Sequence, residues 1–250
     1  MIKSEIKNNT AIIFLARPEK RNALNPELVK DLKNKLLDFE LKEEVRSVII
    51  SGEGDTFCAG ADLEYLKLLS QNSAIDNYND SKSLAELFLM IYNFNKPTIA
   101  AVNGPAIAGG CGLASVCDFI VAHPERSKFG YSEVKIGFLP AIVSIFLVKK
   151  LGEGLAKQLL LEGELINGKR AYEIGFANYL SQDVITESIN LANRLNKNSI
   201  ESLRLTKQMI INISNLKAEE AVEHCIYLNT IGRSSDDFKL GIENFLSKDK

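Results

Sequence analysis

Two turns rich in small residues could hold a developing negative charge. They are VIISGEGDTFCAGADLEYL, residues 48–66, and IAAVNGPAIAGGCGLASV, residues 99–116. In each, a short apolar run leads into glycines and then into a helical pattern. The first N–H groups of a helix have no partner within it, and glycine lets a ligand atom approach them closely. Converging turns of this kind would form an anion or oxyanion site, whereas tight packing of helix on strand is the alternative explanation.

Other chemistries find little support in the sequence. It contains no GxGxxG after its first strand, no GxxxxGK[ST] and no GxSxG, so dinucleotide, P-loop and serine-hydrolase sites are not expected. The four cysteines lack CxxC spacing and the two histidines are far apart, so we expect no metal site.

The segments around these turns predict an α/β core. Short β-branched runs indicate strands at 10–16, 45–51, 97–102 and 118–122. A helix is predicted over 25–40, where an Asn can cap it, a Pro suits its first position, and leucines recur at helical spacing.

The second half of the chain is predicted to be mainly helical. The polar stretch 70–83 is expected to be a mobile loop between two helices. Beyond residue 140 the strand signal nearly vanishes, and four helical patterns begin near 183, 199, 217 and 235. Strands with interleaved helices followed by helices alone indicate an α/β core with a helical C-terminal layer.

Composition narrows the class of protein. The 250 residues are 46% hydrophobic and 25% charged, which is typical of a globular domain with a small extension. The run 141–148 is far shorter than the roughly 20 residues that span a bilayer, and the first residues do not resemble a signal peptide. The net charge of −2 gives no basic surface for nucleic acid. We therefore expect a cytoplasmic protein with neither nucleic-acid nor membrane partners.

Five stretches are similar to motifs of the crotonase, or enoyl-CoA hydratase/isomerase, superfamily. They are RPEKRNALNPEL (17–28), FCAGADL (57–63), AAVNGPAIAGGCGLASVCDFIVA (100–122), FGYSEVKIGFLPA (129–141) and LLLEGELINGKRAYEIGFANYL (159–180). They occur in the family's order and approximate spacing and cover essentially the whole chain. A weaker similarity, in SEVKIGFLPAIVS beside GGCGL, is to the methylglutaconyl-CoA hydratase-like subgroup.

The resemblance implies both an architecture and a substrate. It implies a spiral of ββα units over residues 1–195 and a C-terminal helical region, 196–250, that builds homotrimers, commonly paired into hexamers. The substrate would be an acyl-CoA thioester. Because coenzyme A is then part of the substrate, no further cofactor is expected.

The resemblance also implies a site. In the family two backbone N–H groups hold the thioester oxygen, and on these motifs they fall at Ala61 and Gly109. Such donors stabilise an enolate, each contributing roughly 3 to 4 kcal/mol. The implied contacts to coenzyme A and the acyl group, together with neighbouring pocket positions, are Lys20, Ala23, Leu24, Ala59, Asp62, Leu63, Pro105, Gly110, Gly112, Tyr131 and Ser132.

Two glutamates characterise the family's hydratases, and this chain retains one. The retained residue is Glu133, whose apolar sequence neighbours should raise its pKa and suit it to moving protons near neutral pH. An exposed or salt-bridged Glu beside Lys135 is the alternative. The position of the other glutamate is occupied by Gly112. Glu133 is thus the predicted general acid/base.

One carboxylate leaves several functions open. Hydration of a 2-enoyl-CoA ranks first, isomerisation by 1,3-proton transfer second, and decarboxylation or another enolate chemistry follows. A non-catalytic acyl-CoA-binding paralogue is the rival of a different class. RNA binding through the first helix is not expected, since residues 19–46 carry seven basic and seven acidic side chains.

Overall fold

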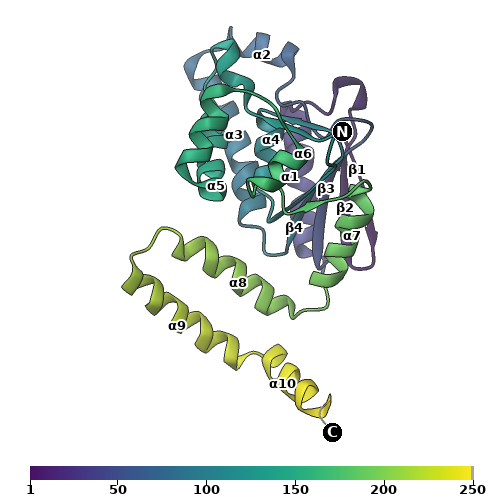
Figure 1. Cartoon of the computed structure of the whole chain (residues 1–250), viewed down its shortest axis with the longest axis vertical. Coiled ribbons are helices and arrows are strands. Elements are labelled where there is room, and N and C mark those ends of the chain that lie inside the picture. Colours follow the sequence, from purple (N-terminus) through teal and green to yellow (C-terminus); the bar gives the residue numbers. More distant parts are fainter. Residues whose placement is uncertain (249–250) are drawn as a thin grey trace.

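A computed structural model describes residues 1–248, apart from the side chains of Leu63 and Lys248. A packed body of strands and helices forms most of the molecule, and the last helices extend away from it (Figure 1). The predicted α/β class with C-terminal helices is confirmed. Within residues 1–248, no helix is long and apolar enough to cross a membrane.

A six-stranded sheet lies at the centre of the body, in the order β1-β2-β3-β4-β6-β9. Its members are β1 (Ile2–Lys7), β2 (Thr10–Leu15), β3 (Ser47–Gly52), β4 (Thr98–Val102), β6 (Phe119–Ala122) and β9 (Tyr179–Leu180). All neighbours are parallel except β1 and β2. The four strands predicted from the sequence are β2, β3, β4 and β6. The edge strand β1 lacks their apolar pattern because nearly all of it faces solvent.

A second, smaller sheet joins the two glycine-bearing turns. It contains β5 (Pro105–Ile107), β7 (Lys128–Gly130) and β8 (Ile166–Asn167). A bridge between Cys58 and Ala106 ties the first turn to β5. Strands of two or three residues are too short for a side-chain period to reveal them, so the sequence did not predict this sheet.

Helices cover both faces of the large sheet. The two faces form separate apolar clusters, since side chains alternate along each strand. Ile12, Ile49 and Ile99 face α7 (Val184–Leu195), which contributes Val184 and Leu191. The opposite cluster contains residues of α1 (Pro26–Leu41), α3 (Ala74–Tyr92), α4 (Gly109–Ser115), α5 (Ala141–Glu162) and α6 (Gly168–Glu173).

The stretch 70–83 is not the loop that the sequence predicted. Only residues 70–73 separate α2 (Leu63–Leu69) from α3, so most of the stretch is the first part of a 19-residue helix. The N–H of Asp76 donates to the Ser73 hydroxyl, which caps this helix. The cap and buried residues further along, such as Phe88, stabilise the helix despite its polar beginning.

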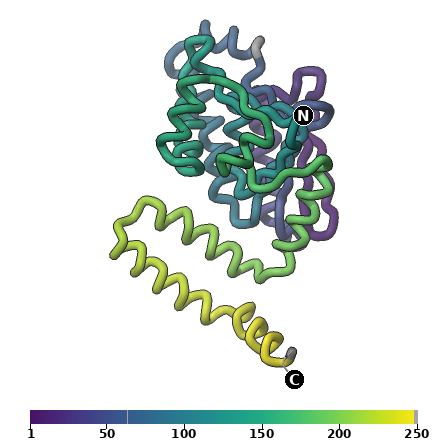
Figure 2. The backbone as a smooth tube through the Cα atoms, in the orientation of Figure 1, coloured from purple at the N-terminus to yellow at the C-terminus, as the bar shows by residue number. Residues whose placement is uncertain are grey.

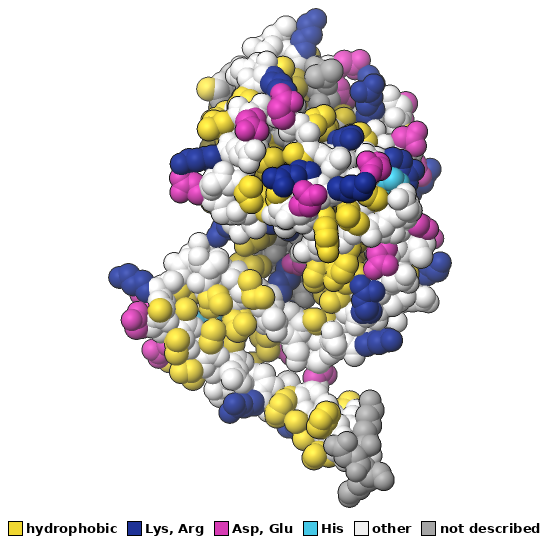
Figure 3. All heavy atoms as spheres, viewed as in Figure 1, with side chains coloured by type: hydrophobic (Ala, Val, Ile, Leu, Met, Phe, Trp, Pro, Cys, Tyr) yellow, Lys and Arg dark blue, Asp and Glu magenta, His cyan; other side chains and the backbone are white. Residues whose placement is uncertain are grey.

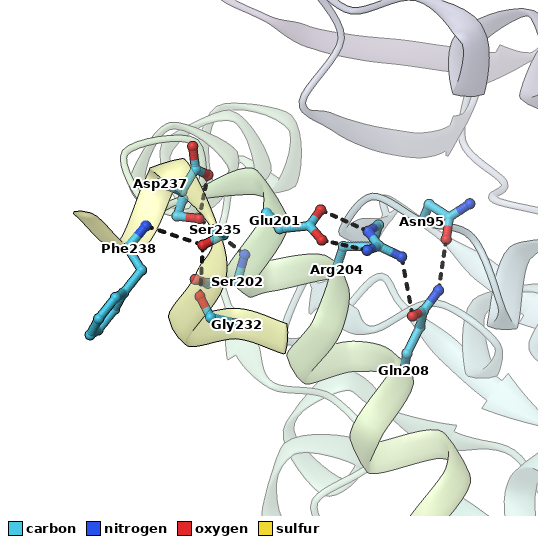
Figure 4. A network of polar contacts seen from close by, with 10 residues as sticks. Asn95, Glu201, Ser202, Arg204, Gln208, Gly232, Ser235, Asp237 and Phe238 are labelled. Atoms are coloured by element: carbon cyan, nitrogen blue, oxygen red, sulfur yellow. Dashed lines mark hydrogen bonds and ion pairs between the residues drawn. The ribbon is translucent and has the colours of Figure 1, made fainter. Parts of the chain in front are cut away.

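Three helices form the C-terminal arm: α8 (Ile200–Ile213), α9 (Ala218–Ser234) and α10 (Asp236–Lys248). They begin close to three of the predicted starts. They reach beyond the body (Figure 2), and no residue of α8 or α9 is buried. Polar contacts attach α8 to the body: the Gln208 amide donates to Asn95 at 3.1 Å (Figure 4), and Lys207 pairs with Asp118 at 2.8 Å.

Candidate active site

The two glycine-bearing turns are in direct contact. Gly60 has φ +86°, and a Cβ built on it would lie 2.8 Å from the carbonyl oxygen of Ile107 and 3.5 Å from the nitrogen of Gly109. The Gly60 carbonyl also accepts the N–H of Leu24 at 2.7 Å. This position requires glycine both for its backbone conformation and for the close approach. The predicted convergence of the turns is present in the structure.

Both predicted oxyanion donors line one cavity. Ala61 and Gly109 lie on its wall, and no acceptor in the described part of the chain takes either N–H group. Ala108, which precedes α4, has φ +50° and ψ −122°, a conformation that costs a non-glycine residue about 1–3 kcal/mol. Strained residues cluster at functional sites, and this one directly precedes the predicted donor Gly109.

The cavity has a volume of about 300 Å³. Its walls come from the turn before α1, the turn 59–61, α2, α3, the turn before α4, the 3-10 helix η2 (Ser132–Ile136) and the start of α5. The predicted site residues that line it are Leu24, Ala59, Ala61, Gly109, Ser132 and Glu133. Seven segments, distant in sequence or separated by turns, thus meet around one space.

Glu133 lies on η2 and is 7% exposed. Its Oε2 atom has no hydrogen-bond partner among the described residues. Burial raises the pKa of this carboxyl above its usual value, although a backbone hydrogen bond acts in the opposite direction. A buried carboxyl with an unpartnered oxygen beside a cavity is a functional candidate, since structural carboxylates normally have partners.

The neighbouring lysine does not neutralise Glu133. Lys135 pairs instead with Glu164, with 2.6 Å between Nζ and Oε1. The alternative in which Glu133 is an ordinary exposed or salt-bridged side chain is therefore wrong. Tyr131 precedes it in the chain, is 1% exposed, and lies outside the cavity lining with a hydroxyl that has no partner in the described residues.

Gly112 is enclosed behind the cavity wall. A Cβ built on it would lie 2.4 Å from Val143 Cγ1 and 3.0 Å from Phe88 Cε2. Val143 lines the cavity and Gly112 does not. Gly110 is likewise buried, since its Cβ would lie 2.1 Å from the Cys58 carbonyl oxygen. A carboxylate at position 112 would therefore require the side chains of Val143 and Phe88 to shift.

The remaining predicted contacts lie outside the cavity lining. Asp62 caps α2 and pairs with Arg17 at 3.0 Å; burial opposes its ionisation, but hydrogen bonds from Arg17 and backbone N–H groups hold its pKa below the usual value. Lys20 pairs with the exposed Glu64 at 2.8 Å. Ala23 is buried beside Leu24, and Pro105 begins β5. The side chain of Leu63 is outside the described residues.

A polar pair in the cavity was not among the predicted site residues. Tyr65 on α2 donates its hydroxyl to Asp80 Oδ1 on α3 at 2.5 Å, and both residues line the cavity. Burial, followed by the Asp80 carboxylate, raises the pKa of Tyr65, so the phenol stays protonated. The helix start at SAID, in which Ser73 is followed three residues later by Asp76, is the signal that could have placed Asp80 on a helix.

The fold is of the α/β class, and its cavity is lined by Ala61 and Gly109, whose N–H groups have no described acceptor, and by one buried carboxyl, that of Glu133. The chain belongs to the enoyl-CoA hydratase/isomerase family, whose model matches residues 5–250. It is 41% identical to a putative enoyl-CoA hydratase of Thermus thermophilus over 97% of this chain and 96% of that one. It is 30% identical to the 2,3-dehydroadipyl-CoA hydratase of Escherichia coli, covering 95% and 92% of the two chains.

Solved structures agree with the family. An enoyl-CoA hydratase from Polaromonas sp. superposes with a TM-score of 0.94 at 31% identity, covering 99% of this chain and 97% of that one. A putative enoyl-CoA hydratase/isomerase from Legionella pneumophila gives 0.91 at 31% identity, with 99% and 96% covered. The predicted crotonase-like fold is confirmed.

Proposed function

We propose that the protein hydrates a 2-enoyl-CoA thioester with Glu133 as its general acid/base. One observation carries the proposal: Glu133, whose Oε2 atom has no partner among the described residues, lines the same cavity as Ala61 and Gly109. The names of the relatives from Thermus thermophilus and Escherichia coli support hydration.

A single carboxylate can complete this reaction. Ionised Glu133 takes a proton from water as the water oxygen bonds to C3 of the enoyl group. The C2–C3 π electrons move toward the thioester, and negative charge collects on its oxygen, where the N–H groups of Ala61 and Gly109 stabilise it. Protonated Glu133 then returns a proton to C2. Atoms and charge balance, and the carboxylate is regenerated without any added cofactor or metal.

Isomerisation is the second candidate, and Gly112 favours it. Hydration benefits from two groups that orient one water, but the contact of a Cβ at position 112 with Val143 leaves no space for a second carboxylate there. Moving a double bond requires only that Glu133 take a proton from C2 of a 3-enoyl thioester and return it to C4, through a dienolate whose oxygen the same two N–H groups would stabilise.

Product analysis separates these functions. The purified protein is incubated with 2-enoyl-, 3-enoyl- and 3-methylglutaconyl-CoA, and products are followed by mass spectrometry. Hydration adds the mass of one water, whereas isomerisation adds none and shifts the double bond. If the protein turned over none of these thioesters but bound a saturated acyl-CoA tightly, it would instead be a non-catalytic acyl-CoA-binding protein.

We also propose that the C-terminal arm assembles the protein into trimers or hexamers. Large apolar side chains gather on the exposed surface of these helices, among them Ile226 at 59% and Phe245 at 68% exposure (Figure 3). Surfaces of this kind are normally buried against a partner. Sedimentation should give a trimer or larger, and Ile226→Glu should reduce the mass; a stable wild-type monomer at micromolar concentration would contradict the proposal.

A further inference from the structure

Among the described residues, the cavity wall has acidic side chains and no basic ones. Among the described residues that line it are two carboxylates, Glu133 and Asp80, and no lysine, arginine or histidine. Neutral polar groups, such as Asn25 and Ser83, and many apolar side chains make up the rest. A carboxylate bound in such a space would lack a counter-ion, and unpaired buried charges are strongly disfavoured.

Lys33 contacts the hydroxyl of one lining residue, Ser83, and its charge is already paired. Lys33 Nζ donates to the hydroxyl of Ser83 at 3.1 Å and to Glu86 Oε2 at 3.0 Å. The positive charge of Lys33 is therefore paired with Glu86, and Lys33 itself does not line the cavity. Lys135 is similarly bound to Glu164 and does not line the cavity.

Asp80 is held in place on α3. The Tyr65 hydroxyl donates to Oδ1 at 2.5 Å, which fixes the direction of the carboxylate. Apolar residues from α2 and α3, including Leu66, Leu69 and Leu84, line the same region. In a cavity of about 300 Å³, a second anion would lie inside the roughly 10 Å over which charges interact before salt screens them.

We infer that Asp80, oriented by Tyr65, restricts the enzyme to acyl groups without a terminal carboxylate. The acyl chains that fit are neutral: apolar, or bearing a hydroxyl that can donate to Asp80. This inference rests on the proposed enoyl-CoA function and specifies its substrate class. Two thioesters with a terminal carboxylate would then be poor substrates: 2,3-dehydroadipyl-CoA, which is named for the Escherichia coli relative, and 3-methylglutaconyl-CoA.

The inference can be tested by binding alone, with two saturated thioesters that the enzyme cannot hydrate or isomerise. Hexanoyl-CoA and adipoyl-CoA have six-carbon acyl chains and differ in the terminal methyl or carboxylate. By isothermal titration, the wild type should bind adipoyl-CoA at least about tenfold more weakly, and Asp80→Asn should narrow that ratio about tenfold, as expected for removing one nearby like charge. Unchanged secondary structure by circular dichroism establishes that the variant is folded.

Asp76→Asn is the matched control. Asp76 lies one helical turn earlier on α3, is exposed and is outside the cavity lining, so its loss should leave the ratio unchanged. Equal wild-type affinity for the two thioesters, or an Asp80→Asn ratio equal to that of the wild type, would overturn the inference while 2-hexenoyl-CoA hydration remained. Binding without any turnover of 2-hexenoyl-CoA or 3-hexenoyl-CoA would overturn the proposed function instead.

Discussion

The two sides of the cavity are built differently. On the side of α4 and the turn 59–61, backbone groups face the cavity, and glycines such as Gly110 and Gly112 leave no room for added atoms. On the side of η2 and α5, side chains face it, with Glu133 partly unpartnered and Leu139 72% exposed. Under the proposed mechanism, the backbone N–H groups that stabilise the enolate are therefore fixed by the packing of the fold. Proton transfer depends instead on one side chain, that of Glu133, which can be replaced without disturbing this packing.

The largest effect is expected from Glu133→Gln, on the side-chain side. Without its general acid/base, kcat should fall about 10²- to 10⁴-fold, because proton transfer typically contributes that much. The variant should nevertheless stay folded, since no partner of Oε2 is lost. Steady-state kinetics and thermal unfolding measure the two quantities.

Glu162→Gln is the control for this variant. Glu162 is exposed at the end of α5 and should be replaceable without loss of rate. Retention of full activity by Glu133→Gln would show that another group carries the proton and that the two sides of the cavity do not divide the chemistry as described.

The next effect is expected on the backbone side, from Gly112→Ala. The added methyl would meet Val143 at 2.4 Å, and overpacking of this kind lowers the free energy of unfolding by about 1–3 kcal/mol. Gly154→Ala, in α5, meets nothing within 4 Å and should be neutral or stabilise by up to about 1 kcal/mol. Denaturant titration compares them. Equal stabilities would mean that the α4 side is less tightly packed than its contacts indicate.

Sequence patterns predicted the parts of this site that depend on local structure. The strands β2, β3, β4 and β6 and the glycines after them could be identified because apolar runs and turn residues have local signatures. The positions of Ala61, Gly109 and Glu133 followed from the family resemblance. That these three share a cavity, and that Val143 excludes a side chain at Gly112, depends on packing between distant segments and could not be predicted.

The α2–α3 region shows the limit of pattern reading. Its polar composition predicted a loop at 70–83, although the cap at Ser73 and apolar residues further along stabilise a helix. Placing Asp80 opposite Tyr65 required that helix. The residues inferred to select the acyl group are consequently those that the sequence revealed least.

The pH dependence of turnover tests the environment of Glu133. Burial raises the pKa of this carboxyl, and it must be ionised to accept a proton, so the acid limb of kcat/KM should lie above the ordinary glutamate pKa of 4.5. Because the pKa of Glu133 is higher in the folded than in the unfolded protein, its protonated form favours folding. This contribution to the free energy of unfolding is fully present below the ordinary glutamate pKa, and it is lost as the pH rises through the pKa of the folded protein.

Glu133→Gln should accordingly be more stable than the wild type at neutral pH and should lose the difference near pH 4. Thermal unfolding across that interval measures this. An acid limb at or below pH 4.5, or a stability difference independent of pH, would show that Glu133 is solvated and that the side-chain side resembles an ordinary surface.

The smallest effect is expected from Lys20→Ala, at the outer edge of the backbone side. Lys20 Nζ lies 2.8 Å from Glu64, and both side chains are exposed. Solvent and salt screen charges at such a site, so we expect Lys20 to attract the phosphates of coenzyme A only weakly. KM should rise a few-fold at low salt with kcat unchanged, and the difference should disappear at high salt. Lys169→Ala removes a similarly exposed ion pair, with Glu125, on α6 and should leave KM unchanged. A fall in kcat for Lys20→Ala would mean that side chains on the backbone side also enter the chemistry, and the contrast between the two sides would no longer hold.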